Sequence, residues 1–281
     1  MEEINLNNKF FLYKSTSNKY AIFVHGMVET MNGYLKVKDY LVNNGINVVL
    51  YDNEGHGENA KNLGHLDIYE SYKMVNDIID IEKYINDNYS PSEVVVIGHS
   101  MGSALVRSAM KSVKFDKVVL NGAPKSLRAF TSNLLLFIYL FINDKKPSML
   151  FNNLVFKSYN KSVESPTSEN DWVCSNLEYL KMYNEDEYSG FIGTGGFYQE
   201  VIRVMAMAKE VKINPTNVLI TSGKNDPVTN MGKSCFQLKN RLEKHGCNCN
   251  VICYENMRHF IYDEIDCNIC YEDLLNFINE V

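Results

Sequence analysis

The stretch VVVIGHSMGSA, residues 94–104, passes from four apolar residues through a glycine-rich turn into a second segment of small residues. A run of β-branched residues is typical of a strand buried on both faces, and the continuation SALVRSAMKSV is typical of a helix. Gly98 and Gly102 stand two positions on either side of Ser100. This pattern predicts that the Ser100 hydroxyl projects above a sheet, at the positive end of a helix dipole, as a nucleophile. The alternative is a glycine-softened turn in which the serine has no chemical role.

Further short apolar runs recur along the chain, with helical periodicity between them. Apolar residues at helical spacing occupy 34–44 and 69–88. Strands that alternate with helices of this length predict an α/β fold, with a mostly parallel central sheet covered by helices on both faces. The predicted strands span residues 9–14, 20–24, 46–52, 93–98, 117–122, 217–223 and 250–255.

One interval between predicted strands is much longer than the others. The fifth and sixth strands are separated by roughly 95 residues, several times an ordinary crossover. This interval contains LLLFIYLFI, residues 134–142, which is about half the length of a membrane span. We therefore expect a core interrupted by an inserted, mainly helical cap. The predicted division is a core in two parts, 1–125 and 206–281, and a cap, 126–205.

A serine hydroxyl is a weak nucleophile, so it requires a general base and an acid that orients the base. After a strand-turn-helix nucleophile, these residues follow in the order Ser, Asp or Glu, His. His245 precedes Gly246 in a pattern typical of a helix end, whereas His259 lies in a loop after the last predicted strand. His259 is therefore the predicted base. Asp226 follows the strand tip in NVLITSGKNDPVTN, and we predict that it is the orienting acid rather than a simple turn former.

Acyl transfer also requires donors that stabilise negative charge on an oxyanion. The predicted donors are the backbone N–H groups of Met101, directly after the nucleophile, and of Met27, in the loop after an earlier strand. His25 is an alternative base, but it precedes Ser100 and, like His56, is expected to shape its loop. The residues expected to support these two motifs are His25, Gly26, Gly98, His99 and Gly102.

Net charge and cysteine content bear on the class of protein. The chain has 28 Lys and Arg against 34 Asp and Glu, a net charge of −6, so no nucleic-acid partner is expected. The first residues, MEEINLNNKFFLYK, lack the basic and apolar regions of a signal peptide. Together with the odd number of cysteines, seven, this favours reduced thiols and a cytoplasmic location. The pairs Cys247/Cys249 and Cys267/Cys270 suggest a zinc site. However, Cys253 lies in the strand-like run VICYE, and Cys267 and Cys270 begin an apolar helix pattern, so we predict small core or surface residues and no metal.

Five motifs occur in one order along the chain: HGMVE (25–29) followed by Tyr34, DNEGHG (52–57), GHSMG (98–102), SGKNDPV (222–228) and RHFIYDE (258–264). Together they resemble the monoglyceride lipase and lysophospholipase branch of the α/β-hydrolases, within the serine aminopeptidase-like hydrolases. The resemblance spans nearly the whole chain and includes the cap segment 171–191. Glu54 stands where the branch commonly has a basic residue, and Asn176 and Leu177 interrupt a charged pair of the cap motif. These departures concern substrate preference and leave the triad intact.

The resemblance implies an α/β-hydrolase fold and hydrolysis of a carboxylic ester with one long acyl chain, such as a monoacylglycerol or a lysophospholipid. It also implies an acyl-enzyme and no metal or organic cofactor. The apolar run 134–142 suits a segment that lines an acyl tunnel or touches a lipid surface, and equally a buried cap helix. Peripheral contact of a cytoplasmic protein with a membrane through the cap is therefore one expectation.

The same residues are compatible with other functions. A general carboxylesterase, an acyltransferase or an aminopeptidase would use the same triad, and an aminopeptidase would need acidic groups such as Glu185, Asp186 and Glu187 to hold a substrate amine. A hydrolase fold used only for ligand binding is disfavoured, because such proteins usually lose a triad member and all three are present here.

Overall fold

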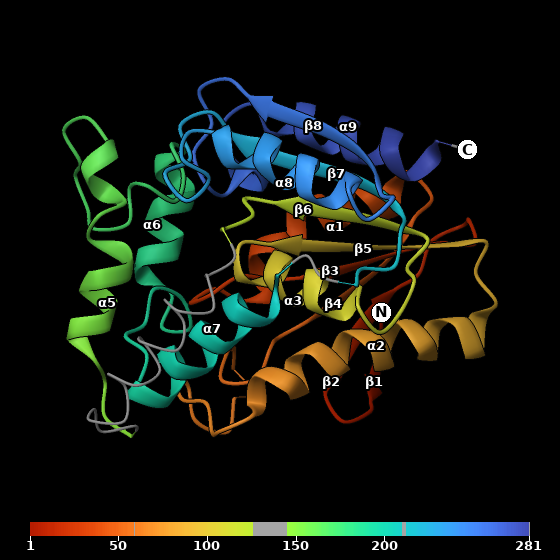
Figure 1. Cartoon of the computed structure of the whole chain (residues 1–281), viewed down its shortest axis with the longest axis horizontal. Coiled ribbons are helices and arrows are strands. Elements are labelled where there is room, and N and C mark those ends of the chain that lie inside the picture. The colour runs from red at the N-terminus through yellow and green to blue at the C-terminus, as the bar shows by residue number, and fades with distance from the viewer. Residues whose placement is uncertain (59, 126–144, 210–211, 281) are drawn as a thin grey trace.

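A single sheet forms the centre of the protein in the computed structural model, which describes residues 1–58, 60–125, 145–209 and 212–280. Within these ranges the sheet has eight strands in the order β1-β2-β4-β3-β5-β6-β7-β8 (Figure 1). All neighbours from β4 to β8 pair in parallel, and β1 and β2 extend one edge in antiparallel fashion. The strands are β1 (Glu2–Asn5), β2 (Lys9–Tyr13), β3 (Lys19–Val24), β4 (Asn47–Tyr51), β5 (Glu93–His99), β6 (Lys117–Asn121), β7 (Asn217–Gly223) and β8 (Asn248–Tyr254).

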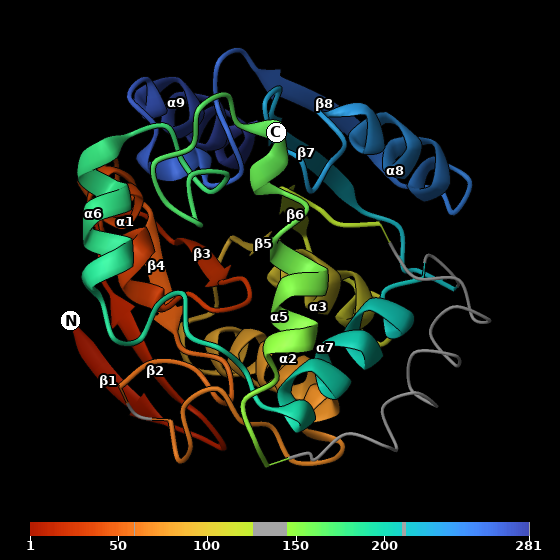
Figure 2. The same cartoon turned by 90° about the vertical axis from the view of Figure 1, so that its left-hand side faces the viewer.

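Helices cover both faces of this sheet, as predicted (Figure 2). Helices α2, α3, α7 and α8 pack on one face, and α1 and α9 pack on the other. In the described residues, no helix has both the length and the apolar character that crossing a bilayer requires. The helices are α1 (Leu35–Asn43), α2 (Glu70–Tyr89), α3 (Met101–Ala109), α5 (Met149–Phe156), α6 (Leu177–Glu185), α7 (Gly195–Met207), α8 (Lys233–Glu243) and α9 (Cys267–Asn279).

The two faces explain why the central strands are apolar without alternation. In β5, Val94 and Val96 point into one core, whereas Val95 and Ile97 point into the other. Each of these side chains is almost completely buried, which stabilises the fold by about 1.5–3 kcal/mol per side chain relative to exposure. A strand between two helical layers therefore needs apolar residues at every position.

The cysteines follow the same division between faces. Cys247 and Cys249 belong to the core on the α8 side, whereas Cys267 and Cys270 contribute to the core on the α9 side. The sheet separates the two pairs, so the four residues do not converge on one position. Their placement matches that of small core residues.

The structure also contains a strand that the sequence patterns did not predict. The side chains of β1 are exposed or only partly buried, so this short edge strand lacks the apolar alternation that identifies a strand in sequence. The apolar run 134–142 lies outside the described residues.

The parallel strands place their carboxyl ends at one edge of the sheet, where ligands bind in open α/β folds. The loops after β3, β5, β7 and β8 all begin there. Helices α5 and α6, from the long interval between β6 and β7, lie at this same end of the molecule (Figures 1 and 2).

Candidate active site

Ser100 occupies the sharp turn between β5 and α3. Its backbone has φ = 50° and ψ = −116°, a conformation that is strained for a residue with a side chain. Its N–H donates to the carbonyl of Asn121 at 2.9 Å, which joins the turn to the neighbouring strand. A Cβ atom on Gly102 would lie 2.0 Å from the Val24 carbonyl oxygen, and one on Gly98 would lie 2.6 Å from the Gly102 carbonyl oxygen. Both glycines are therefore required by close backbone approach, as the sequence pattern implied.

Asp226 and His259 meet beside this turn. Asp226 Oδ2 lies 3.0 Å from His259 Nδ1, and both side chains are buried. Asp226 also accepts hydrogen bonds from the N–H of Val228 at 2.8 Å and from the hydroxyl of Ser222 at 3.3 Å. Burial alone would raise the pKa of Asp226, but the charge and hydrogen bond of His259, with the Val228 amide, lower it below its ordinary value. The carboxylate is thus ionised and oriented toward one imidazole nitrogen.

Backbone contacts hold these two loops together. The Asn225 N–H donates to the Met257 carbonyl at 2.8 Å. A Cβ on Gly223 would lie 2.1 Å from that same carbonyl oxygen. The end of β7 therefore lies too close to the loop of His259 to accommodate a side chain at this position. The next residue after His259 is held from another direction: the Phe260 N–H donates to the Val173 carbonyl, in the segment before α6, at 2.7 Å. The position of His259 is therefore set by contacts from the core and from the inserted region.

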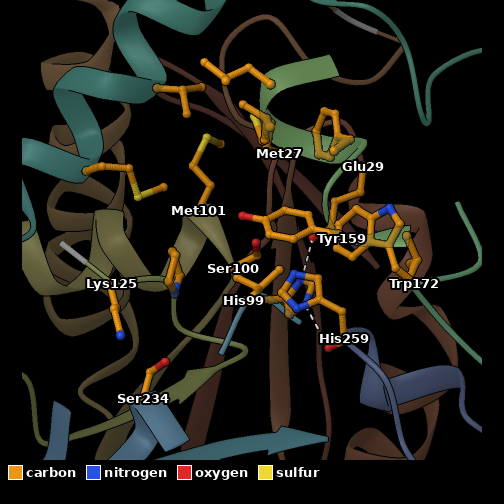
Figure 3. A pocket seen from close by; sticks show the side chains of 18 of the residues that line it. Met27, Glu29, His99, Ser100, Met101, Lys125, Tyr159, Trp172, Ser234 and His259 are labelled. Carbon is orange, nitrogen blue, oxygen red and sulfur yellow. Dashed lines mark hydrogen bonds and ion pairs between the residues drawn. The ribbon is translucent and has the colours of Figure 1, made fainter. Parts of the chain in front are cut away.

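A cavity of about 370 Å³ opens beside these residues and is lined by both Ser100 and His259 (Figure 3). This volume lies within the range of small-molecule sites in proteins. The walls come from the core and from α5 and α7, and they are mainly apolar; they include Phe151, Leu154, Val201, Ile202 and Met205. The candidate nucleophile and His259 thus lie together in one mainly apolar cavity.

Met27 and Met101, whose backbone N–H groups are the predicted oxyanion donors, both line this cavity. Met101 is the first residue of α3, so its N–H has no carbonyl partner one turn earlier. In the loop after β3, the Gly26 N–H donates to Glu29 and the Val28 N–H donates to His56 at 3.3 Å. Between them, the Met27 N–H has no acceptor among the described residues.

His25 and His56 have hydrogen bonds that fit a role in shaping loops. The Nε2 atom of His25 accepts from the Asn53 N–H at 2.9 Å, so its Nδ1 carries the hydrogen that is donated to the Gly26 carbonyl at 2.8 Å. Burial lowers the pKa of His25, and burial lowers that of His56 to about 3. Neither ring lines the cavity in the described part of the chain. His245 lies just beyond the end of α8, next to Gly246 at φ = 87°, as the sequence pattern predicted.

Three side chains of the cavity had no role in the sequence analysis. Glu29 lines the cavity and contacts His99, and the only sequence signal for it is its place as the last residue of the motif HGMVE. Trp172 packs on His259 with ring centroids 5.2 Å apart, and Tyr159 packs on Trp172 at 5.0 Å. In Figure 3, Tyr159 extends across the cavity toward Ser100. No periodic pattern connects either aromatic residue to the core, so the sequence alone gave no signal for them.

The eight-stranded sheet, the strained serine turn and the loops at the carboxyl edge define an α/β-hydrolase fold. A family model described as "Serine aminopeptidase, S33" matches residues 16–266. The chain belongs to this hydrolase family, in agreement with the resemblance that its motifs indicated.

Known proteins similar to this chain include lipases and esterases. A monoglyceride lipase homologue from Monkeypox virus is 21% identical over 270 residues, which cover 93% of this chain and 91% of the relative. A thermostable carboxyl esterase from Bacillus coagulans, solved with glycerol, has a TM-score of 0.90 at 20% identity; the match covers 99% of this chain and 97% of the esterase chain. A monoglyceride lipase from Saccharomyces cerevisiae, solved with a substrate analogue, has a TM-score of 0.71 at 15% identity and covers 99% and 94%. At these identities, the solved structures establish the shared fold.

Proposed function

We propose that the protein hydrolyses carboxylic esters through a triad of Ser100, His259 and Asp226. His259, oriented by Asp226, takes the proton of the Ser100 hydroxyl as that oxygen attacks the ester carbonyl. The Met27 and Met101 N–H groups donate to the oxyanion of the tetrahedral intermediate. His259 then protonates the departing alcohol, and water cleaves the acyl-enzyme by the same route. The Asp226–His259 contact of 3.0 Å, beside a cavity shared with Ser100, is the observation that carries this proposal.

We further propose that the substrate has a single acyl chain, as in a monoacylglycerol or a lysophospholipid. The walls contributed by α5 and α7 are rich in Phe, Leu, Val, Ile and Met side chains. Burial of each methylene of an acyl chain against such walls contributes about 0.8 kcal/mol. In this proposal, the described part of the inserted region, residues 145–205, acts as a cap over the reacting ester.

Esters of graded chain length test this substrate class. We expect kcat/KM to rise with each methylene while the cavity fills, by up to about fourfold per methylene, and then to level off or fall. The measurement is hydrolysis of p-nitrophenyl, monoacylglycerol and lysophospholipid esters of matched acyl chains. A maximum at acetyl esters would contradict the lipid proposal and leave a general carboxylesterase.

An aminopeptidase is the second candidate, because it is the activity in the family description. Such an enzyme would need a free carboxylate in the cavity to hold the substrate amine. Glu185, Asp186 and Glu187 are absent from the lining among the described residues, and Asp186 accepts hydrogen bonds from Tyr188 and Ser189. This arrangement favours the esterase, and turnover of aminoacyl-amides would reverse the choice.

Helix α5 offers a surface through which the cap could contact lipid. Met149 and Leu150 are 53% and 69% exposed, and Leu154, which lines the cavity, is 62% exposed. Patches of exposed apolar side chains mark sites of interaction with proteins, ligands or membranes. We propose that this face of α5 rests on the lipid surface that supplies the substrate.

The double substitution Met149→Ser and Leu150→Ser tests this contact. We expect binding to lipid vesicles to weaken about tenfold or more, because each lost side chain removes about 1.5–3 kcal/mol of apolar burial. Vesicle co-sedimentation measures the binding, and hydrolysis of a dissolved short ester should be unchanged. Ile269→Ser is the matched control, since Ile269 is 54% exposed on α9. Equal binding of the double variant and the wild type would remove α5 from the proposal.

A further inference from the structure

Glu29 is a buried carboxylate on which three hydrogen-bond donors converge. Its Oε1 atom accepts from the Gly26 N–H, from the Tyr34 hydroxyl at 2.7 Å and from His99 Nδ1 at 2.9 Å. Burial would raise the pKa of Glu29, but the charge and hydrogen bond of His99 and the further donors lower it to about 2. An oxygen that accepts three hydrogen bonds, in a group with this pKa, belongs to an ionised carboxylate.

His99 lies between this carboxylate and the loop of the proposed base. Its Nδ1 faces Glu29 Oε1, and its Nε2 lies 3.3 Å from the backbone carbonyl oxygen of His259 (Figure 3). A carboxylate and a carbonyl are both acceptors, and neither has a hydrogen to donate. The ring makes both hydrogen bonds only when each nitrogen carries a hydrogen, and this form is the imidazolium.

We propose that Glu29 and His99 form a buried ion pair that positions the catalytic base, a role that rests on the proposed function. The His99 imidazolium holds the His259 carbonyl through Nε2–H, and the same Glu29 oxygen holds the Gly26 amide beside Met27. His99 immediately precedes Ser100. One carboxylate thus connects the loops of the oxyanion donor, the nucleophile and the base, which follow three different strands. Glu29 and His99 are positioning residues, since they act through His259 and Met27.

This positioning role depends on the opposite charges of Glu29 and His99. Charge-assisted hydrogen bonds are about twice as strong as neutral ones, and an imidazolium buried without its carboxylate would be strongly disfavoured. Loss of the carboxylate charge therefore leaves His99 with one hydrogen. That hydrogen stays between His99 and residue 29, so the His259 carbonyl faces a bare nitrogen and loses its donor.

Glu29→Gln separates this positioning role from simple packing. The amide has the size of the carboxylate and keeps an oxygen for Gly26, Tyr34 and a neutral His99, but it has no charge. We expect kcat to fall about 10- to 100-fold, the cost of a small misplacement of catalytic groups, with KM within about twofold of wild type. Unchanged kcat would overturn the proposal. Glu200→Gln is the matched control, because Glu200 is a fully buried carboxylate that binds Ser71 and Arg203 away from the cavity.

Nitrogen NMR of histidine-labelled protein gives a direct readout that needs no enzymatic activity. The chain has six histidines, and the His99 signals are assigned by their absence in His99→Asn. In the wild type at neutral pH, we expect both His99 nitrogens to have the shifts of an imidazolium; in Glu29→Gln, one should have the shift of an unprotonated nitrogen. A wild-type His99 with one unprotonated nitrogen would overturn the ion pair even if the variant fails to fold. Failure of the wild type to hydrolyse any ester would refute the proposed function and leave this NMR result standing.

Discussion

Ser100→Ala should lower kcat for ester hydrolysis by about 10⁴- to 10⁶-fold, the loss expected when a serine hydrolase loses its nucleophile. In the proposed mechanism, the variant still binds substrate and still presents the Met27 and Met101 amides to the oxyanion. Without the hydroxyl, however, no acyl-enzyme forms, and His259 has only water to activate. KM should therefore change far less than kcat. Hydrolysis of p-nitrophenyl esters by the purified variant measures the effect.

A nearby serine provides the control for this substitution. Ser108 lies in α3, the helix that Ser100 precedes, and its hydroxyl donates to the Ala104 carbonyl at 2.8 Å. Ser108→Ala should retain wild-type activity, and it should react with a fluorophosphonate probe that fails to label Ser100→Ala. Wild-type rates in Ser100→Ala would show that the strained turn is structural and that the chemistry belongs to another residue.

The parts of the fold that followed from the sequence are those in which local pattern and tertiary demand agree. The valine run of β5 is buried on both faces, so its continuous apolar character predicted a central strand. The importance of Gly98 and Gly102 was predicted from their spacing around Ser100 between a strand and a helix, and the close backbone contacts show that a side chain at either position would collide with the chain. The edge strand β1 was missed because its exposed side chains need no periodic pattern.

The candidate site divides in a similar way. Asp226 and His259 could be predicted because chain order and strand ends restrict where such residues occur, and the structure brings their side chains to 3.0 Å. The proposed role of Glu29 depends instead on the two acceptors that flank the His99 ring. These are the Glu29 carboxylate, 70 residues away in sequence, and the His259 carbonyl, 160 residues away. Trp172 reaches His259 from the insertion, and its position is set by tertiary packing. No local sequence pattern predicts the contacts of His99 or the contact between Trp172 and His259.

Asp226→Asn should lower kcat by about 10⁴-fold, as is found when the acid of a Ser-His-Asp triad becomes an amide. The carboxylate is acceptor-only, so it keeps the hydrogen of His259 on Nδ1 and leaves Nε2 free to take a proton. An amide can place its NH₂ group toward Nδ1, which selects the tautomer that cannot act as the base. Activity should fall at every pH of the working range, because the pKa of Asp226 is already below its ordinary value and the wild-type carboxylate stays ionised.

The same substitution has an effect on stability whose sign follows from that pKa. A carboxyl group with a lowered pKa in the folded state stabilises the fold at pH values above its unfolded pKa of about 4. This stabilisation is lost as the pH falls through the folded value. Asp226→Asn should therefore have a lower free energy of unfolding than the wild type at pH 7, and the difference should shrink below pH 4. Denaturant unfolding at both pH values measures it, with Asp273→Asn as the control, since Asp273 lies on α9 and binds Tyr254 at 3.1 Å. A variant with full activity and wild-type stability at pH 7 would contradict this role of Asp226. It would show that another group orients His259, such as the segment 171–175, whose Val173 carbonyl accepts from the Phe260 N–H.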